Sequence, residues 1–176
     1  MQYPAVISRE GKFILTEFPD CPGCQTFVEE GQSIEDAAQE ALEGWLESNL
    51  GRDLVPPRPS DRIASGHRTL MIPVDPLLGV RLELRWARDD ADLTQARLAQ
   101  RIGMTQQQLA KLESGGNPTL STLSRIARGL GRRVVVSLER ESQRVVRKRK
   151  NALVRERSPD HLARSVKESA KRRRKR

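Results

Sequence analysis

Three consecutive glutamines, Gln106, Gln107 and Gln108, are the residues of this 176-residue chain whose type and spacing most directly suggest chemistry. The amide of a glutamine can donate and accept a hydrogen bond at once, which matches the edge of adenine in the major groove of DNA. Thr105 precedes them and is a residue type favoured at the start of a helix, so the amides fall in the first turn. Lys111 follows on the same exposed side. The pattern predicts a helix that reads base edges.

The residues before Thr105 fit the first half of a helix-turn-helix. Ala99 is small enough for two helices to cross there, and Gly103 tolerates the positive φ that a sharp turn needs. Gln95 begins the preceding helix, whose N-terminal amide groups can meet a phosphate. Residues 93–130 resemble the phage-repressor, or Cro/C1 (Xre), type of helix-turn-helix, which implies binding to double-stranded operator DNA. The alternative is a plain helical hairpin with solvated glutamines.

Cys21 and Cys24 are separated by Pro and Gly and could form half of a metal site or a redox pair. Zinc needs four ligands, and the only histidines are His67 and His161. A redox pair is expected at the start of a helix, whereas this pair falls in a loop between predicted strands. We therefore expect a turn with buried thiols, without a metal or a cofactor.

Four acidic residues of the front half, Glu17, Asp20, Glu29 and Glu30, lie at the ends of predicted strands or in a loop. A magnesium-dependent nuclease needs clustered carboxylates, and no motif links these four. We expect them at the surface, facing a protein partner, and we expect no enzymatic activity. A nuclease remains the alternative from another class, and magnesium-dependent cleavage would reveal it.

Charge is distributed unevenly along the chain, whose formal net charge is +9. Residues 1–70 carry six basic and twelve acidic side chains, net −6, whereas residues 71–138 carry ten and six, net +4. Residues 139–176 carry sixteen and five, net +11, and end in six consecutive basic residues. Basic segments suit nucleic acid, and an acidic front half suits a basic protein. The tail is either a nonspecific nucleic-acid arm or a solvated segment.

The elements expected around these residues define an α+β protein. Short β-type runs cover residues 3–8, 12–18, 25–29 and 69–74, and an amphipathic helix begins after Ser33. Helices are expected from Asp75-Pro76 to about Arg88 and over residues 95–102, 105–114 and 120–130, followed by a terminal strand at 134–138. The predicted domains are residues 1–74, a sheet with a helix, residues 75–139, the helix-turn-helix, and residues 140–176, a basic tail.

The front segments resemble the HicB antitoxin family. The resemblance lies in residues 3–7 (Tyr-Pro-Ala-Val-Ile), 18–24 (Phe-Pro-Asp-Cys-Pro-Gly-Cys), 33–37 (Ser-Ile-Glu-Asp-Ala) and 45–46 (Trp-Leu), followed by a Pro-rich connector at 56–59. It implies a partial ribonuclease-H-like fold that binds and covers HicA, a small basic toxin that cleaves messenger RNA. The long basic tail departs from the family, whose antitoxins usually end soon after the last strand.

Together these features predict the antitoxin of a type II toxin–antitoxin pair that also represses its own operon as a homodimer or higher homo-oligomer. The alternative is a free-standing transcription regulator with a ligand-sensing front domain, which a large apolar pocket would favour. The first residues show no charged leader before an apolar run, and no apolar stretch approaches 18 residues. We therefore expect a cytoplasmic protein without a membrane segment.

Overall fold

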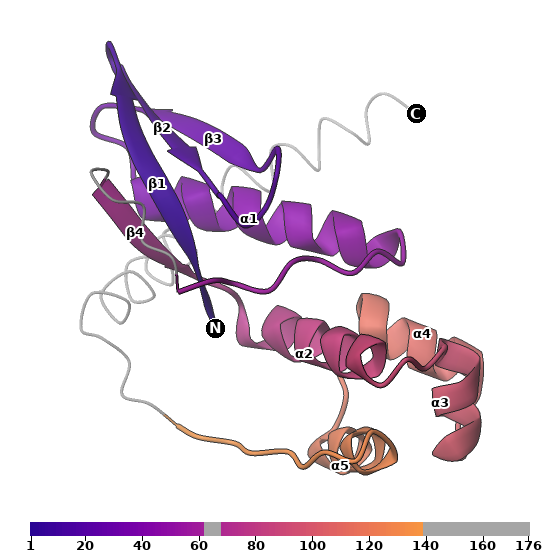
Figure 1. Ribbon diagram of the computed structural model, residues 1–176. Helices are drawn as coiled ribbons and strands as arrows, with labels where there is room; N and C mark the ends of the chain where they lie inside the picture. Colours follow the sequence, from indigo (N-terminus) through magenta and orange to yellow (C-terminus); the bar gives the residue numbers. More distant parts are fainter. Residues whose placement is uncertain (62–67, 139–176) are drawn as a thin grey trace, which may run out of the picture. The chain divides into compact units, whose positions relative to one another are not determined.

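The front of the chain folds into a four-stranded antiparallel sheet in the computed structural model, which describes residues 1–61 and 68–138 (Figure 1). The strands are β1 (Gln2–Glu10), β2 (Phe13–Glu17), β3 (Gln25–Glu29) and β4 (Arg68–Pro73), in the order β3-β2-β1-β4. Gly11, at φ 62°, closes the hairpin between β1 and β2. All four predicted strands are confirmed, and β4 pairs antiparallel with β1 at the edge of the sheet.

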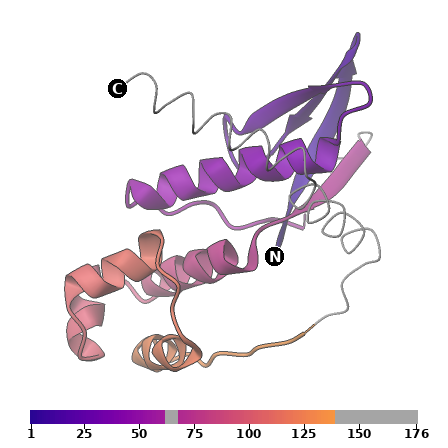
Figure 2. The ribbon, with the colours of Figure 1, turned by 180° about the vertical axis from the view of Figure 1, so that it is seen from behind.

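One face of this sheet is covered by helix α1 (Ile34–Gly51), as the view from behind shows (Figure 2). The Ser33 side chain caps α1 by accepting a hydrogen bond from the Asp36 backbone N–H, as its residue type predicted. Leu42 and Leu46 of α1 are fully buried against Tyr3 of β1 and its neighbours. The apolar stripe of α1 therefore supplies the core of the front part.

The opposite face of the sheet has no described helix packed on it. The alternation along β2 and β3 places Phe13, Leu15 and Phe27 on this face, and Leu15 pairs directly with Phe27. The ring of Phe27 is edge-on to that of Phe13, with centroids 5.7 Å apart, and Phe27 is 68% exposed. Glu17 and Glu29 share the same face by register. We call these five residues the open sheet face.

Helix α2 (Pro76–Asp90) belongs to two hydrophobic cores. Asp75 caps it by accepting from the backbone N–H groups of Leu77 and Leu78, with Pro76 in the first turn, as the sequence predicted. Leu78, Leu82 and Trp86 complete the core of the sheet and α1. Leu84, from another side of the helix, packs into the core of the helices that follow. Residues 1–134 accordingly form one compact unit.

The three helices after α2 are α3 (Gln95–Arg101), α4 (Gln106–Ser114) and α5 (Leu120–Gly129). Their buried side chains form a second core, which contains Leu98, Ala99, Ile102, Leu109, Leu123 and Ile126. Gly129 of α5 lies so close to α3 that a Cβ there would overlap the Cγ2 methyl of Ile102. None of the described helices combines the length and hydrophobicity needed to cross a membrane.

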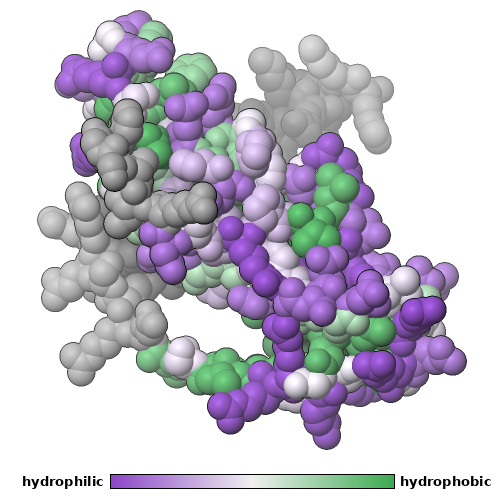
Figure 3. Space-filling view, in the orientation of Figure 1, coloured by the Kyte–Doolittle hydropathy of each residue, from purple (hydrophilic) through white to green (hydrophobic). Residues whose placement is uncertain are grey.

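The strand predicted at residues 134–138 is not formed in the single chain. Residues 132–138 are neither helix nor strand, and Val135, Val136 and Leu138 are strongly exposed. Figure 3 shows hydrophobic surface along the extended segment that follows α5. An isolated β-branched segment has no ladder partner, so its preference for strand geometry is not expressed. The predicted tail at 140–176 lies outside the described residues.

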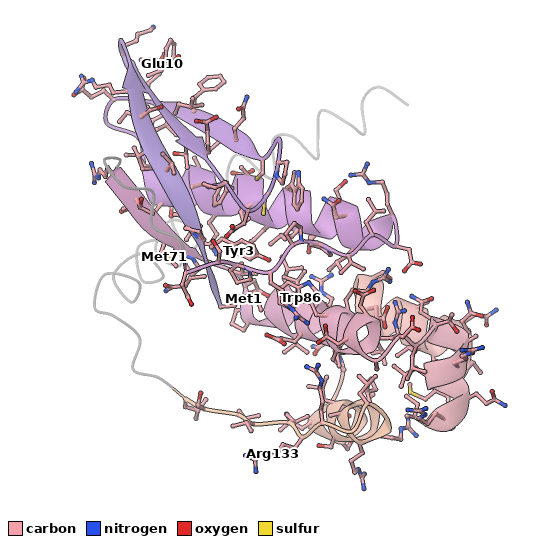
Figure 4. All side chains as sticks on the ribbon, viewed as in Figure 1. Met1, Tyr3, Glu10, Met71, Trp86 and Arg133 are labelled. Carbon is pink, nitrogen blue, oxygen red and sulfur yellow. The ribbon has the colours of Figure 1, made fainter. Side chains whose placement is uncertain are left out.

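Two aromatic side chains fasten the Pro-rich connector to the rest of the molecule. The Tyr3 hydroxyl donates to the carbonyl of Pro57 at 2.7 Å, and the Trp86 indole N–H donates to the carbonyl of Pro56, also at 2.7 Å (Figure 4). Burial raises the pKa of Tyr3, and the nearby Cys21 and Asp20 raise it further, so the hydroxyl keeps its proton. The connector is therefore held between β1 and α2.

Candidate nucleic-acid interface

The start of α4 is built as the recognition end of a helix-turn-helix. Met104 links α3 to α4 after Gly103, whose φ of 65° makes the turn that the sequence predicted there. The hydroxyl of Thr105 accepts from the Gln108 backbone N–H at 3.1 Å, and the Gln108 Oε1 accepts from the Thr105 backbone N–H at 3.0 Å. This reciprocal capping box satisfies two backbone donors and fixes the first turn.

The predicted DNA-reading residues of α4 fall into two groups. Gln106, Gln107 and Lys111 are exposed, and none of their side chains forms a hydrogen bond or an ion pair with another described residue. Gln108 is also exposed, but its side-chain oxygen is occupied by the capping box, as is the hydroxyl of Thr105. Gln106 and Gln107 therefore have the free amides that base reading requires, while Gln108 and Thr105 shape the helix that presents them.

Gln95 begins α3 as predicted, but its side chain points into the protein. Its Nε2 donates to Glu113 at 3.0 Å and to Asp53 at 3.4 Å. The side-chain amide is thus engaged with two carboxylates. A phosphate contact at this position would have to use the backbone N–H groups, as the sequence interpretation supposed.

Sequence reasoning missed a row of arginines on α2 that underlies the recognition helix. Arg81, Arg85 and Arg88 follow each other at steps of four and three, and their side chains are 8–9% exposed. Arg88 forms a two-point ion pair with Glu113 of α4, with Nε–Oε1 and Nη2–Oε2 distances of 2.7 and 2.8 Å. The spacing of the three arginines indicates that they share one face of a helix, but no sequence pattern indicates that this face is buried.

Glu113 is 4% exposed, so this ion pair is almost completely removed from water. Burial by itself lowers the pKa of Arg88, but the hydrogen bond and charge of Glu113 outweigh it, and the net shift raises the pKa. The Arg88 Nη1 also donates to the Leu93 carbonyl at 2.9 Å, just before α3. Arg88 therefore joins α2, α4 and the approach to α3.

The other two arginines connect the recognition helix to the front of the chain. Arg81 donates to Glu47 of α1 at 2.8 Å and to the Ser114 carbonyl at the end of α4 at 3.0 Å. Arg85 donates to the carboxylate and backbone carbonyl of Asp53, just after α1, and lies 3.5 Å from Glu113. We call Arg81, Arg85, Arg88, Glu47, Asp53 and Glu113 the arginine–carboxylate cluster. Its three positive and three negative charges balance.

The predicted partner-facing acids are not all free at the surface. Glu29 pairs with Lys12 at 3.4 Å and Glu30 pairs with Arg9 at 3.1 Å, both in exposed pairs. Asp20 differs, because its carboxylate accepts from the backbone N–H and the hydroxyl of Ser60, both at 2.8 Å. Asp20 thus anchors the connector, and Glu17 and Glu29 lie on the open sheet face.

Cys21 and Cys24 lie in the front core. Burial raises the pKa of Cys21 to about 12, with the neighbouring Cys24 adding to it, and burial raises the pKa of Cys24 to about 11. The Cys24 thiol faces the Ala41 carbonyl, 3.7 Å from Sγ to O. Among the described residues no three His, Cys, Asp or Glu side chains are grouped to hold a metal, and His67 and His161 are outside them.

A hollow of about 590 Å³ lies beside Trp86 and is lined by Met1, Arg58, Pro59, Glu83, Trp86, Asp90 and Arg132. Arg58 and Arg132 each donate to the same oxygen of Asp90 at 2.6 Å. These hydrogen bonds, that of Arg58 first, lower the pKa of the Asp90 carboxyl. Four of the seven lining residues are charged, so the hollow is not the apolar pocket expected of a small-molecule sensor.

The helix-turn-helix family HTH_3 matches residues 84–136 of this chain. Those residues are a Cro/C1-type helix-turn-helix. This family match and the geometry of α3 and α4 confirm the DNA-binding domain, so the chain is a DNA-binding regulator. No curated protein matches the chain. A solved "HicA3 and HicB3 toxin-antitoxin complex" is similar at 24% identity and a TM-score of 0.39, covering 43% of this chain and 100% of the other.

Proposed function

We propose that this chain is the antitoxin and autorepressor of a type II toxin–antitoxin pair, acting in the cytoplasm. The back part binds operator DNA, and the front part binds and covers a small basic, messenger-RNA-cleaving toxin of the HicA type. The DNA half of the proposal is carried by the exposed Gln106 and Gln107 at the capped start of α4. The toxin half is supported by the HicB-like motifs of residues 3–46 and by the negative charge of residues 1–70.

The open sheet face is the surface we propose for the toxin. A large aromatic side chain that is 68% exposed, beside Phe13 and Leu15, is typical of a surface that a partner covers. Glu17 and Glu29 border this apolar patch and would complement a basic partner. Apolar contact would supply affinity there, and the carboxylates would supply orientation and association rate.

Two variants of the full chain test the proposal by separating its halves. The protein is co-expressed with the short basic protein encoded by the adjacent gene, and growth, complex formation and DNA binding are measured. Phe27→Glu should abolish toxin neutralisation and leave DNA binding intact, whereas Gln107→Ala should weaken operator binding by about 1–3 kcal/mol and leave neutralisation intact. Loss of both activities in either variant, or a wild-type chain that binds no basic partner, would contradict it.

The alternative is a regulator whose front part senses a small ligand. The hollow beside Trp86 is the site that it would use, and Arg58 lies over the Trp86 ring at 5.6 Å. The charged lining and the engagement of Arg58 and Arg132 with Asp90 favour the antitoxin instead.

A further inference from the structure

The arginine–carboxylate cluster links α1, α2 and α4. These helices must keep a fixed relative geometry if α4 is to read base edges. Arg85 contacts Asp53 after α1 and lies near Glu113 of α4. Gln95, the first residue of α3, donates to the same two carboxylates. Arg81 holds the last carbonyl of α4 while it pairs with Glu47 of α1. Both ends of the helix pair are therefore tied to residues outside the helix-turn-helix.

We propose that Asp53 and Glu47, carboxylates of the front part, are positioning residues for the recognition helix, acting through Arg85 and Arg81. They touch no DNA. They fix the direction of Arg85 and Arg81, and these arginines set where α4 and the start of α3 stand. The front part is thus a component of the DNA-reading apparatus as well as a binding domain. This inference rests on the DNA-binding half of the proposed function.

The composition of the cluster supports positioning over simple stabilisation. Among the described residues, the Nε atoms of Arg81 and Arg85 are buried without a hydrogen-bond partner. Burying cations with incomplete hydrogen bonding opposes folding, and apolar residues of similar size often stabilise such a site equally well. Asp53 is 69% exposed and Glu47 55% exposed, so their pairs gain little energy by themselves. The main contribution of the cluster is therefore to fix the position of the recognition helix rather than to stabilise the fold.

The full chain offers a matched control for the test. Asp53 and Asp92 both follow a helix with positive φ, 58° and 51°, a conformation that asparagine tolerates. Asp53→Asn removes the carboxylate that Arg85 and Gln95 use, whereas Asp92→Asn removes an equal charge with no ion pair among the described residues. A general electrostatic effect on DNA binding would appear in both variants.

The probes are a duplex enriched from a random library by the wild-type chain and a scrambled duplex of the same composition. Asp53→Asn, Glu47→Gln, Arg85→Met and Arg81→Met should each lower the ratio of the two affinities about fivefold or more. Asp92→Asn should leave the ratio unchanged. Adding Asp53→Asn to Arg85→Met should have less than the sum of the two single effects, because both variants break the link between Asp53 and Arg85, while Asp53→Asn also removes the carboxylate to which Gln95 donates.

Melting temperatures measured on the same samples separate positioning from folding. We expect the methionine variants to melt within a few degrees of the wild type while they lose selectivity. An unchanged or increased affinity ratio in the Asp53 and Arg85 variants would overturn the inference, as would a loss that merely follows the melting temperature. A wild-type chain that enriches no duplex would instead refute the DNA-binding function itself.

Discussion

Gln107 and Gln108 are adjacent and chemically identical, but their side chains have different roles because their hydrogen-bonding environments differ. Gln107 has a free amide at the start of α4, whereas the oxygen of Gln108 closes the capping box with Thr105. The box could have been read from the spacing of Thr105 and Gln108, because a Thr with Gln three positions later is its signature. Once Gln108 is assigned to the capping box, Gln106 and Gln107 are the glutamines whose side-chain amides have no hydrogen bond within the described chain.

Gln107→Ala should weaken binding to the selected duplex by about 1–3 kcal/mol and binding to a scrambled duplex very little, because one base contact is lost. Gln108→Ala should instead lower the melting temperature, because it removes half of the capping box. Binding titrations and thermal melts of both variants check this. Equal selectivity of wild type and Gln107→Ala would mean that the reading surface lies elsewhere.

The two thiols give a prediction that depends on pH. Burial raises the pKa of Cys21 to about 12 and of Cys24 to about 11, so the folded chain holds almost no thiolate at pH 8. Because the pKa values of both thiols are raised in the folded state, the protonated thiols contribute to the stability of the fold. This contribution is fully present below pH 9 and is lost as the pH rises toward 12.

Iodoacetamide should therefore alkylate the folded chain at pH 8 at least about 100-fold more slowly than the same chain in urea, as mass spectrometry can follow. The difference should shrink as the pH is raised. Fast alkylation of folded protein at pH 8 would show that one thiol is open to solvent and would reopen the redox interpretation.

Local sequence patterns predicted most of the helices and strands. Alternation predicted the strands, and Ser33 and Asp75 predicted two helix starts, because a cap depends only on residues within one turn. The arginine row of α2 could not be interpreted in this way. Its partners Glu47, Asp53 and Glu113 lie 25–34 residues away in the chain, and only tertiary packing determines that cations face inward.

Glu113→Ala should lower the free energy of unfolding by about 3–5 kcal/mol, because Arg88 stays buried without its partner. The double variant Arg88→Met with Glu113→Leu should recover much of that loss. Glu30→Ala is the control, since its pair with Arg9 is exposed and should change stability by less than about 1 kcal/mol. Urea unfolding measures all three, and an equal effect of Glu113→Ala and Glu30→Ala would contradict the prediction.

Gly129→Ala should destabilise the chain by about 1–3 kcal/mol, because the added methyl group would push α5 away from Ile102, the residue that directly follows α3. Gly44→Ala, in a helix position with open space around the added methyl, should be neutral or stabilising. Melting curves of the two variants compare a close helix contact with helix propensity alone. A stabilised Gly129→Ala would show that α5 can shift without loss.

For the molecule as a whole, the exposed residues 135–138 bear on self-association. We expect a symmetric dimer in which this segment of each chain pairs with that of its partner, since paired half-sites supply affinity on DNA. Replacing both Val135 and Val136 by Lys should give a monomer in light scattering and weaken operator binding. A wild-type chain that is monomeric at micromolar concentration and binds one half-site tightly would contradict this.

The double membership of α2 limits how this protein can be divided or recombined. A fragment ending at residue 74 would lack Leu78, Leu82 and Trp86, and its exposed core would favour aggregation. A fragment starting after α2 would lack the arginines beneath α4. Each half therefore needs the same helix. The front part could be exchanged between such proteins only if α2 were transferred together with it. The arginines of α2 would then need new partners on the recognition helix of the recipient protein.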